Sequence, residues 1–190
     1  MPIQKVDRKS IIKNSLTVFK EKGYHNTSMA DLAIACGLMK GSFYHYFPSK
    51  QALMHEILIT LKDHYVEKVF SMAYDESLSP EERVHELAHK SEEIFMEEKG
   101  GCFMVSIGLE TIHVVDEFTK IIKDFFAAWI DAMRNLYAYY LPENEAIIQA
   151  ELTVAEVEGS VMLMQIMQDK EYLKRMNKKL ISQFTQLKKQ

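Results

Sequence analysis

The stretch Gly37–Lys50, GLMKGSFYHYFPSK, decides how the N-terminal part of the chain folds. At helical spacing Phe43 and Phe47 fall on one face, which suits burial, while Tyr44 falls on the opposite face with the polar residues of the run. The pattern predicts a short helix over residues 39–47. A polar face that carries aromatic rings indicates a surface that contacts another molecule.

Signals before this stretch predict a helix-turn-helix. Apolar residues at i, i+4 and i+7 predict a helix over residues 7–22, which ends at Gly23. Ser28 and Asp31 have the spacing of a capping box, so a second, short helix follows and ends at Gly37. Two short helices joined by a glycine turn are the arrangement whose second helix enters the DNA major groove.

Helical signals continue along the rest of the chain, and no segment predicts a strand. One long helix is expected over residues 49–74. A capping box with the favoured proline, Ser79-Pro80, starts the next helix, which the pair Gly100-Gly101 ends. Four more helices are expected over residues 102–113, 116–140, 143–168 and 171–187. The predicted fold class is therefore all-α, with nine helices.

The composition is that of a folded globular protein of one or two domains. Of the 190 residues, 47% are hydrophobic and 26% charged, which argues against disorder. No uncharged apolar run reaches the roughly 18 residues of a membrane span, and the N-terminus lacks the apolar core of a signal peptide. Two cysteines, Cys36 and Cys102, do not make a disulfide framework, so we expect a protein of the reducing cytoplasm.

Charge is distributed unevenly along the chain. Residues 1–50 hold eight Lys or Arg and three Asp or Glu, a net charge of +5; the other 15 bases and 24 acids give residues 51–190 a net charge of −9. A basic N-terminal part on an acidic body is typical of a small domain that contacts a polyanion. The alternative is an incidental excess of lysine on a solvated face.

The polar face of the 39–47 helix carries side chains suited to DNA. Gly41 would let the helix backbone come close to the duplex, which explains a residue that costs about 0.5–1 kcal/mol inside a helix. Donors to base edges or phosphate oxygens on this helix are Lys40, Ser42, Tyr44 and His45. Lys50 stands at the start of the long helix, where the helix dipole disfavours a cation unless a phosphate lies there.

The run Thr27–Met54, TSMADLAIACGLMKGSFYHYFPSKQALM, closely resembles the DNA-binding segment of the TetR/AcrR transcriptional regulators. The resemblance implies phosphate contacts by Thr27 and Ser28, base readout by Lys40 and Ser42, and a clamp on the DNA backbone formed by Tyr44, His45 and Lys50. The family usually has Ser or Thr where this chain has Met39. That cap, worth about 1 kcal/mol, is lost, and Met39 can contact a thymine methyl instead.

The same resemblance implies a domain organisation and a set of partners. Residues 1–50 would form the helix-turn-helix DNA-binding domain and residues 51–190 a ligand-binding and dimerisation domain, with the helix over 49–74 as the connection. The expected partners are a double-stranded DNA operator, a second copy of the chain and a small apolar or aromatic effector, without a cofactor, metal or membrane. We expect a homodimeric repressor that its effector releases from DNA.

Apolar stripes on the last two predicted helices favour a four-helix dimer bundle, which the resemblance also implies. The residues expected at this interface are Ile148, Leu152, Ala155, Gly159, Met162, Leu163, Leu180 and Phe184. The alternative is that these stripes belong to the core of one subunit.

The middle of the chain is rich in large, soft side chains, which suit an adaptable apolar pocket. The resemblance implies a ligand cavity among these helices. The residues expected to line it are Phe95, Cys102, Phe103, Met104, Ile107, Phe125, Trp129, Met133 and Met162. Each of them can equally be plain core.

Two further motifs leave alternatives open. His85-Glu86-Leu87-Ala88-His89 matches the H-E-x-x-H pattern of zinc hydrolases, but no third-ligand motif follows, so an incidental histidine pair is the simpler interpretation. Cys102 follows Lys99-Gly100-Gly101 at a predicted helix start, where a thiolate would be stabilised, and GGCFMV resembles electrophile-sensing regulators of the same family. A thiol-based sensor is therefore the main alternative to a reversible ligand, and a zinc hydrolase the remote one. We do not expect an enzyme.

Overall fold

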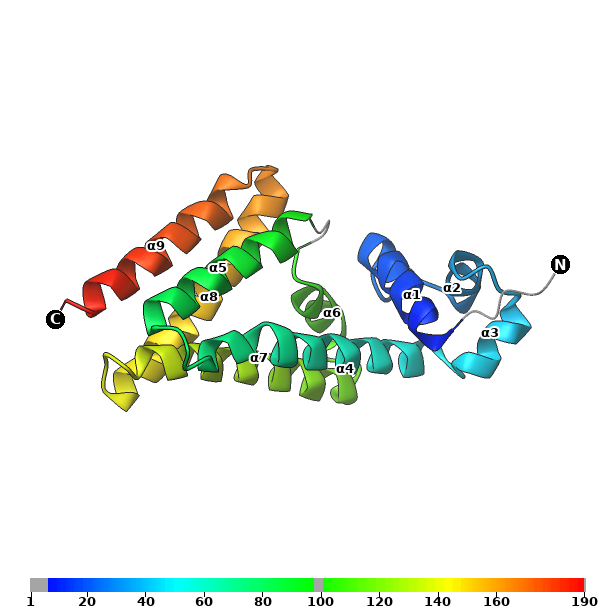
Figure 1. Cartoon of the computed structure of the whole chain (residues 1–190). Coiled ribbons are helices and arrows are strands. Elements are labelled where there is room, and N and C mark those ends of the chain that lie inside the picture. The colour runs from blue at the N-terminus through cyan, green and yellow to red at the C-terminus, as the bar shows by residue number, and fades with distance from the viewer. Residues whose placement is uncertain (1–6, 98–100, 190) are drawn as a thin grey trace. The chain divides into compact units, whose positions relative to one another are not determined.

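The computed structural model describes residues 7–97 and 101–189, which form nine α-helices and one 3-10 helix (Figure 1). In chain order they are α1 (Arg8–Lys22), α2 (Met29–Ala35), α3 (Lys40–Tyr46), α4 (Lys50–Lys68), the 3-10 helix η1 (Phe70–Tyr74), α5 (Pro80–Glu97), α6 (Phe103–Thr111), α7 (Asp116–Tyr137), α8 (Glu143–Met167) and α9 (Glu171–Leu187). The predicted all-α class is confirmed, and each of the nine expected helices is present.

The chain divides into two compact units. The first ends at Leu61 and also includes Phe103–Ile122, so it holds α1 to α3, the first part of α4, α6 and the start of α7. The second comprises the remaining described residues. The unit that contains the helix-turn-helix is thus larger than the DNA-binding domain expected over residues 1–50.

In the first unit, α1 packs against α2 and α2 against α3. The helix α1 begins at Asp7, whose carboxylate accepts the Ser10 N–H at 2.6 Å and so caps the helix. Fully buried side chains from α1 to α4 form the core: Ile11, Phe19, Leu32, Phe43, Phe47, Leu53, Met54 and Ile57. The core therefore joins the short helices to the first half of α4.

The long helix expected over residues 49–74 is the one element that the structure changes. The helix α4 ends at Lys68, and η1 takes its place. No glycine or proline marks this break in the sequence. Its cause is tertiary, because the Ala73 carbonyl accepts from Asn135 Nδ2 at 3.0 Å and from Arg83 Nη1 at 3.3 Å.

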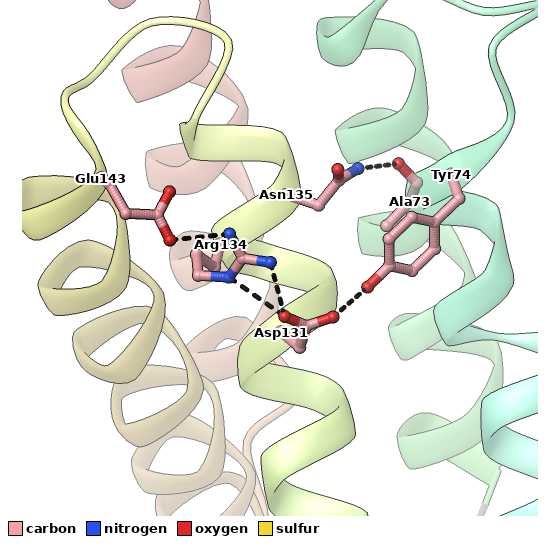
Figure 2. A network of polar contacts seen from close by, with 6 residues as sticks. All are labelled: Ala73, Tyr74, Asp131, Arg134, Asn135 and Glu143. Atoms are coloured by element: carbon pink, nitrogen blue, oxygen red, sulfur yellow. Dashed lines mark hydrogen bonds and ion pairs between the residues drawn. The ribbon is translucent and has the colours of Figure 1, made fainter.

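A polar network ties η1 to α7 and α8 (Figure 2). The Tyr74 hydroxyl donates to Asp131 at 2.7 Å, and Arg134 bridges Asp131 and Glu143 at 2.7 and 2.8 Å. Burial, together with its bond to Asp131, raises the pKa of Tyr74 to about 12. Side chains far apart in sequence thus hold the end of α4 in place.

The second unit is built around α9, which packs against both α5 and α8. Buried apolar side chains of α7, α8 and α9 fill its centre, among them Phe125, Leu136, Tyr137, Val154, Val161, Leu173 and Phe184. None of the described helices is long and apolar enough to cross a membrane.

Candidate nucleic-acid interface

The turn between α2 and α3 forms from local sequence signals. Ser28 and Asp31 make the predicted capping box at the start of α2, with the Asp31 N–H donating to Ser28 Oγ at 3.2 Å. Gly37 has φ +66°, a left-handed conformation that favours glycine. The residue before α3, Met39, makes no side-chain cap, as the sequence predicted.

One face of α3 is buried and the other is open. Phe43 is fully buried, whereas Met39 and Tyr44 are 79% and 43% exposed. Lys40, Gly41 and His45 are also exposed, and Ser42 is half-buried. A Cβ added at Gly41 would meet no atom of the chain within 4 Å, so packing within the subunit does not require a glycine there. The face predicted to contact DNA is thus exposed in the free chain.

The C-terminal end of α3 is held by Arg8. Its guanidinium donates to the Tyr46 carbonyl at 2.8 Å, pairs with the Glu56 carboxylate through both of its oxygens, and lies 4.1 Å from the centre of the Phe47 ring. This contact, here called the Arg8 clamp, joins the starts of α1 and α4 to the end of α3. Since α3 is short and uncapped at its start, the clamp fixes its position.

Three of the predicted DNA contacts are occupied within the chain. Thr27 is buried, and its hydroxyl donates to the Gly23 carbonyl at 2.7 Å. The Ser28 hydroxyl is used by the capping box. Lys50 Nζ donates to the Tyr24 carbonyl at 2.6 Å. Thr27 and Lys50 therefore have internal partners in the free chain, and their predicted phosphate contacts stay predictions.

Sequence reasoning missed Glu110, which joins α6 to the turn after α1. Its carboxylate accepts the backbone N–H groups of Tyr24 at 2.8 Å and His25 at 3.2 Å. Gly23 has φ +76°, which favours glycine, and a Cβ there would lie 2.8 Å from Glu110 Oε1 and so displace the carboxylate. Burial lowers the pKa of Lys50. The negative charge of Glu110 opposes this shift, because it favours the ammonium form. No local pattern could have indicated this contact.

These contacts lead to a prediction for Lys50→Ala. The variant should lower the free energy of unfolding by about 1 kcal/mol, because the Tyr24 and His25 carbonyls lose the Lys50 ammonium as a donor. The slope of DNA affinity against salt concentration should stay unchanged if Lys50 keeps its internal partners on DNA, because no phosphate contact is then lost. Denaturant unfolding and salt-dependent binding measure the two quantities. A slope reduced by about one counterion would show that Lys50 contacts a DNA phosphate.

Comparison with known proteins follows the same division of the chain. A profile described as bacterial regulatory proteins of the tetR family matches residues 11–57. A second, described as the C-terminal domain of LmrA/YxaF-like transcriptional regulators, matches residues 80–179, more than half of the chain. The chain belongs to the TetR family. Its members are transcription regulators and not enzymes.

Individual TetR-family relatives agree with this assignment. YxaF of Bacillus subtilis is 26% identical over 166 residues, which are 86% of this chain and 87% of YxaF. The repressor DhaR of Mycobacterium sp. (strain GP1) is 22% identical over 173 residues, 87% of this chain and 86% of DhaR. YuxN of Bacillus subtilis is 42% identical over 67 residues, which span 35% of this chain but only 22% of YuxN. A TetR regulator structure from Legionella pneumophila, 19% identical, superimposes with a TM-score of 0.82 over 96% of this chain and 98% of that one.

The second unit of this TetR-family chain contains a cavity of about 50 Å³. Its walls are aromatic and aliphatic, including Tyr65, Phe70 and Trp129, and Trp129 stacks on Phe70 at 5.8 Å between ring centres. A polar corner is formed by Ser91 and Asn177, whose side chains hydrogen-bond to each other. The cavity is thus apolar with a few convergent polar groups.

The cavity takes in only part of the predicted pocket. Phe95, Trp129 and Met133 line it. Phe125 packs behind Trp129, with 6.2 Å between the ring centres. The other predicted lining residues lie elsewhere: Phe103, Met104 and Ile107 are buried in the first unit, Met162 is 55% exposed, and Cys102 is buried without facing the cavity. Those five do not line this cavity, and their contact with an effector stays a prediction.

The helix α8 has an unusual distribution of side-chain size. Its buried face carries small or β-branched residues, Ala146, Ala150, Thr153, Val154, Val157 and Val161, together with Met164. Its exposed face carries larger ones, with exposed fractions of 39% to 68%: Ile148, Leu152, Met162, Leu163 and Ile166. Ala155 and Gly159 lie along the same face, partly or fully exposed. Leu180 and Phe184 on α9 are buried in their own subunit, so they are corrected from the interface to the core.

The H-E-x-x-H motif lies on the surface of α5. His85, Glu86 and His89 are exposed, and His89 Nδ1 lies 3.4 Å from the Glu93 carboxylate. Within residues 7–97 and 101–189, no group of three or more His, Cys, Asp or Glu side chains could hold a metal ion. The motif thus lies on the solvent-facing side of α5, where the described residues bring no third ligand to it.

Cys102 is buried beside an acid. Cys36 and Cys102 form no disulfide, and the Cys102 thiol hydrogen-bonds to the Glu158 carboxyl of α8. Burial raises the pKa of that carboxyl to about 7, an effect that the thiol partly opposes. One carboxyl oxygen, Glu158 Oε1, is buried and has no hydrogen-bond partner among the described residues. Lys99, which the thiolate argument invoked, lies outside the described residues.

Proposed function

We propose that this TetR-family regulator is a homodimeric repressor that binds a partly palindromic operator and is released by a small apolar or aromatic effector. The observation that carries the proposal is the open face of α3, where Met39, Lys40, Gly41, Tyr44 and His45 are exposed on a helix held by the Arg8 clamp. A rigid helix with donors on its open face suits the major groove. DhaR, a repressor by name, supports the sign of regulation.

The proposal predicts the form of the operator. Selection of bound sequences from random DNA should enrich two inverted half-sites about 34–36 Å apart, since a two-fold dimer presents its α3 helices to successive major grooves. Footprinting of a selected site should show two protected segments on one face of the duplex. Enrichment of a single, asymmetric half-site, or of no sequence, would contradict sequence recognition by a two-fold dimer.

The cavity supports a reversible effector that enlarges its own site. Ligand pockets usually measure about 300–1,000 Å³, so a volume of about 50 Å³ admits no drug-sized molecule as it stands. An aromatic effector would stack against Trp129 and Phe70 and direct its polar group to Ser91 and Asn177. To enter, it would have to displace lining side chains at the end of α4 and in η1, such as Tyr65 and Phe70. Binding would then favour a different conformation of the second unit.

We favour this reversible effector over the thiol-based sensor. A thiolate at Cys102 would face the carboxylate of Glu158, and two like charges in one buried site oppose each other. The thiol is also only 8% exposed. Reactive cysteines are characteristically accessible, and Cys102 is therefore not in such an environment.

The buried carboxyl predicts a pH-dependent gain for Glu158→Gln. The pKa of Glu158 is about 7 in the folded chain, above its ordinary value of 4.5, so its stabilising contribution is complete below pH 4.5 and is lost as the pH rises through 7. Glutamine carries no such charge. The stability of the variant relative to the natural chain should rise by about 1–2 kcal/mol between pH 5 and pH 8. Denaturant unfolding at both pH values measures this change. If the two chains differ in stability by the same amount at pH 5 and pH 8, ionisation of Glu158 does not destabilise the folded chain.

A further inference from the structure

A second concavity lies entirely within the first unit, between α1 and α4. It measures about 600 Å³. Its floor is aliphatic and comes from both helices: Ile12 and Leu16 on α1 and Leu61 on α4 are partly exposed there, and the fully buried Ile57 lies beneath them. No aromatic ring lines it, and Thr60 is the single uncharged hydrogen-bonding residue among its lining side chains. This α1–α4 groove therefore differs in chemistry from the aromatic cavity of the second unit.

The rim of the groove is positively charged. Lys9 and Lys13 line it from α1, four residues apart and both exposed. Among the described residues no acid lies within ion-pairing distance of either lysine. The Asp7 carboxylate interacts electrostatically with Lys9, but it accepts its hydrogen bond from the Ser10 N–H at the start of α1. The Glu56 carboxylate pairs with Arg8. The two ammonium groups are thus left to face an external anion.

We propose that the α1–α4 groove binds a long-chain fatty carboxylate. The aliphatic floor would take a flexible alkyl chain, because it offers neither stacking surfaces nor hydrogen bonds to an aromatic or polar ligand. Side chains one helical turn apart converge on one small anion, so Lys9 and Lys13 would hold the carboxylate. A groove of this volume suits such a ligand.

The groove also includes residues of the Arg8 clamp, which holds the end of α3. Arg8 and Glu56 line the groove and form the Arg8 clamp, whose third partner is the Tyr46 carbonyl at the end of α3. A bound carboxylate would compete with Glu56 for the guanidinium and loosen the end of α3. The ligand would then weaken operator binding from within the first unit, a consequence that rests on the proposed function, whereas binding itself does not.

The test uses the full chain and sodium decanoate, kept below its micelle concentration. Decanoate should shift the methyl signals of Ile12 and Ile57 in NMR spectra of methyl-labelled protein, and affinity should rise up to about fourfold for each methylene added from octanoate to decanoate. The double variant Lys9→Gln, Lys13→Gln should bind about tenfold more weakly. Its control, Lys120→Gln with Lys123→Gln, removes the same charge from α7 and should bind decanoate normally. Decyltrimethylammonium, with the opposite charge, should not bind.

A variant that fills the groove completes the design. Thr60 is exposed, so Thr60→Trp should keep the thermal unfolding midpoint and the ligand-free operator affinity while abolishing decanoate binding. Shifts confined to cavity methyls such as Ile94 would assign decanoate to the effector cavity and overturn the proposal, with the proposed function intact. Binding that survives Thr60→Trp, or binding of an acidic amphipathic peptide in place of decanoate, would also overturn it. Decanoate binding with unchanged operator affinity would refute the link through the Arg8 clamp.

Discussion

Lys40→Ala is expected to weaken binding to the selected operator by roughly 30-fold or more and to relax the base preference at one position of each half-site. A lysine that donates to a base edge contributes about 1–3 kcal/mol, and a dimer loses this contact twice. Lys40 is exposed on the open face of α3 and makes no ion pair among the described residues, so its removal leaves the fold intact. Binding titrations against the operator and its single-base variants measure both effects.

Two companions separate base readout from charge. Lys120→Ala removes the same charge from the exposed surface of α7 and should leave the operator preference unchanged. Tyr44→Phe keeps the ring but removes the hydroxyl, so it should weaken all sequences alike if that group donates to phosphate. If Lys40→Ala lowers affinity for operator and unrelated DNA by the same factor, the lysine contacts the backbone and does not read a base.

Met162→Glu combined with Leu163→Glu is expected to give monomers whose operator affinity falls by about three orders of magnitude. Both residues belong to the exposed apolar face of α8, and two buried charges in each subunit would oppose association. A monomer reaches only one half-site, so its affinity should approach the non-specific level. Analytical ultracentrifugation at micromolar concentration and operator titration provide the two readouts.

The matched control for this variant is Leu109→Glu. Leu109, on α6, is 78% exposed, so the change adds the same kind of charge to an apolar surface outside α8. It should remain dimeric. A natural chain that sediments as a monomer, or a Met162→Glu, Leu163→Glu variant that remains a dimer, would move the interface away from α8.

Local patterns predicted the fold well because they describe local physics. The capping box of Ser28 and Asp31, the positive φ of Gly37 and the missing cap at Met39 all depend on residues within one turn of each other. The helix ends were therefore predictable to within a few residues. The exception, the end of α4 at Lys68, depends on Asn135 and Arg83, whose positions no local pattern encodes.

The candidate site was only partly predictable for the same reason. Exposure of the α3 face follows from helical spacing, because Phe43 must be buried when its opposite face is polar. The partners of Lys50 and the role of Glu110 come from residues far apart in the chain, and periodicity carries no information about them. The apolar stripes of α8 and α9 could be buried either within one subunit or at an interface. The sequence alone did not show that Phe184 belongs to the core.

The position of Trp129 gives the protein an intrinsic optical reporter. It is the sole tryptophan of the chain, and its indole lines the cavity and stacks on Phe70 and Phe126. Any molecule that enters must alter the surroundings of that one fluorophore, so the emission of the unlabelled protein reports a single site. Operator DNA contains no tryptophan and binds at a different surface. Occupancy of the cavity and release from DNA can therefore be followed in one cuvette, by indole emission and by the anisotropy of a dye on the DNA.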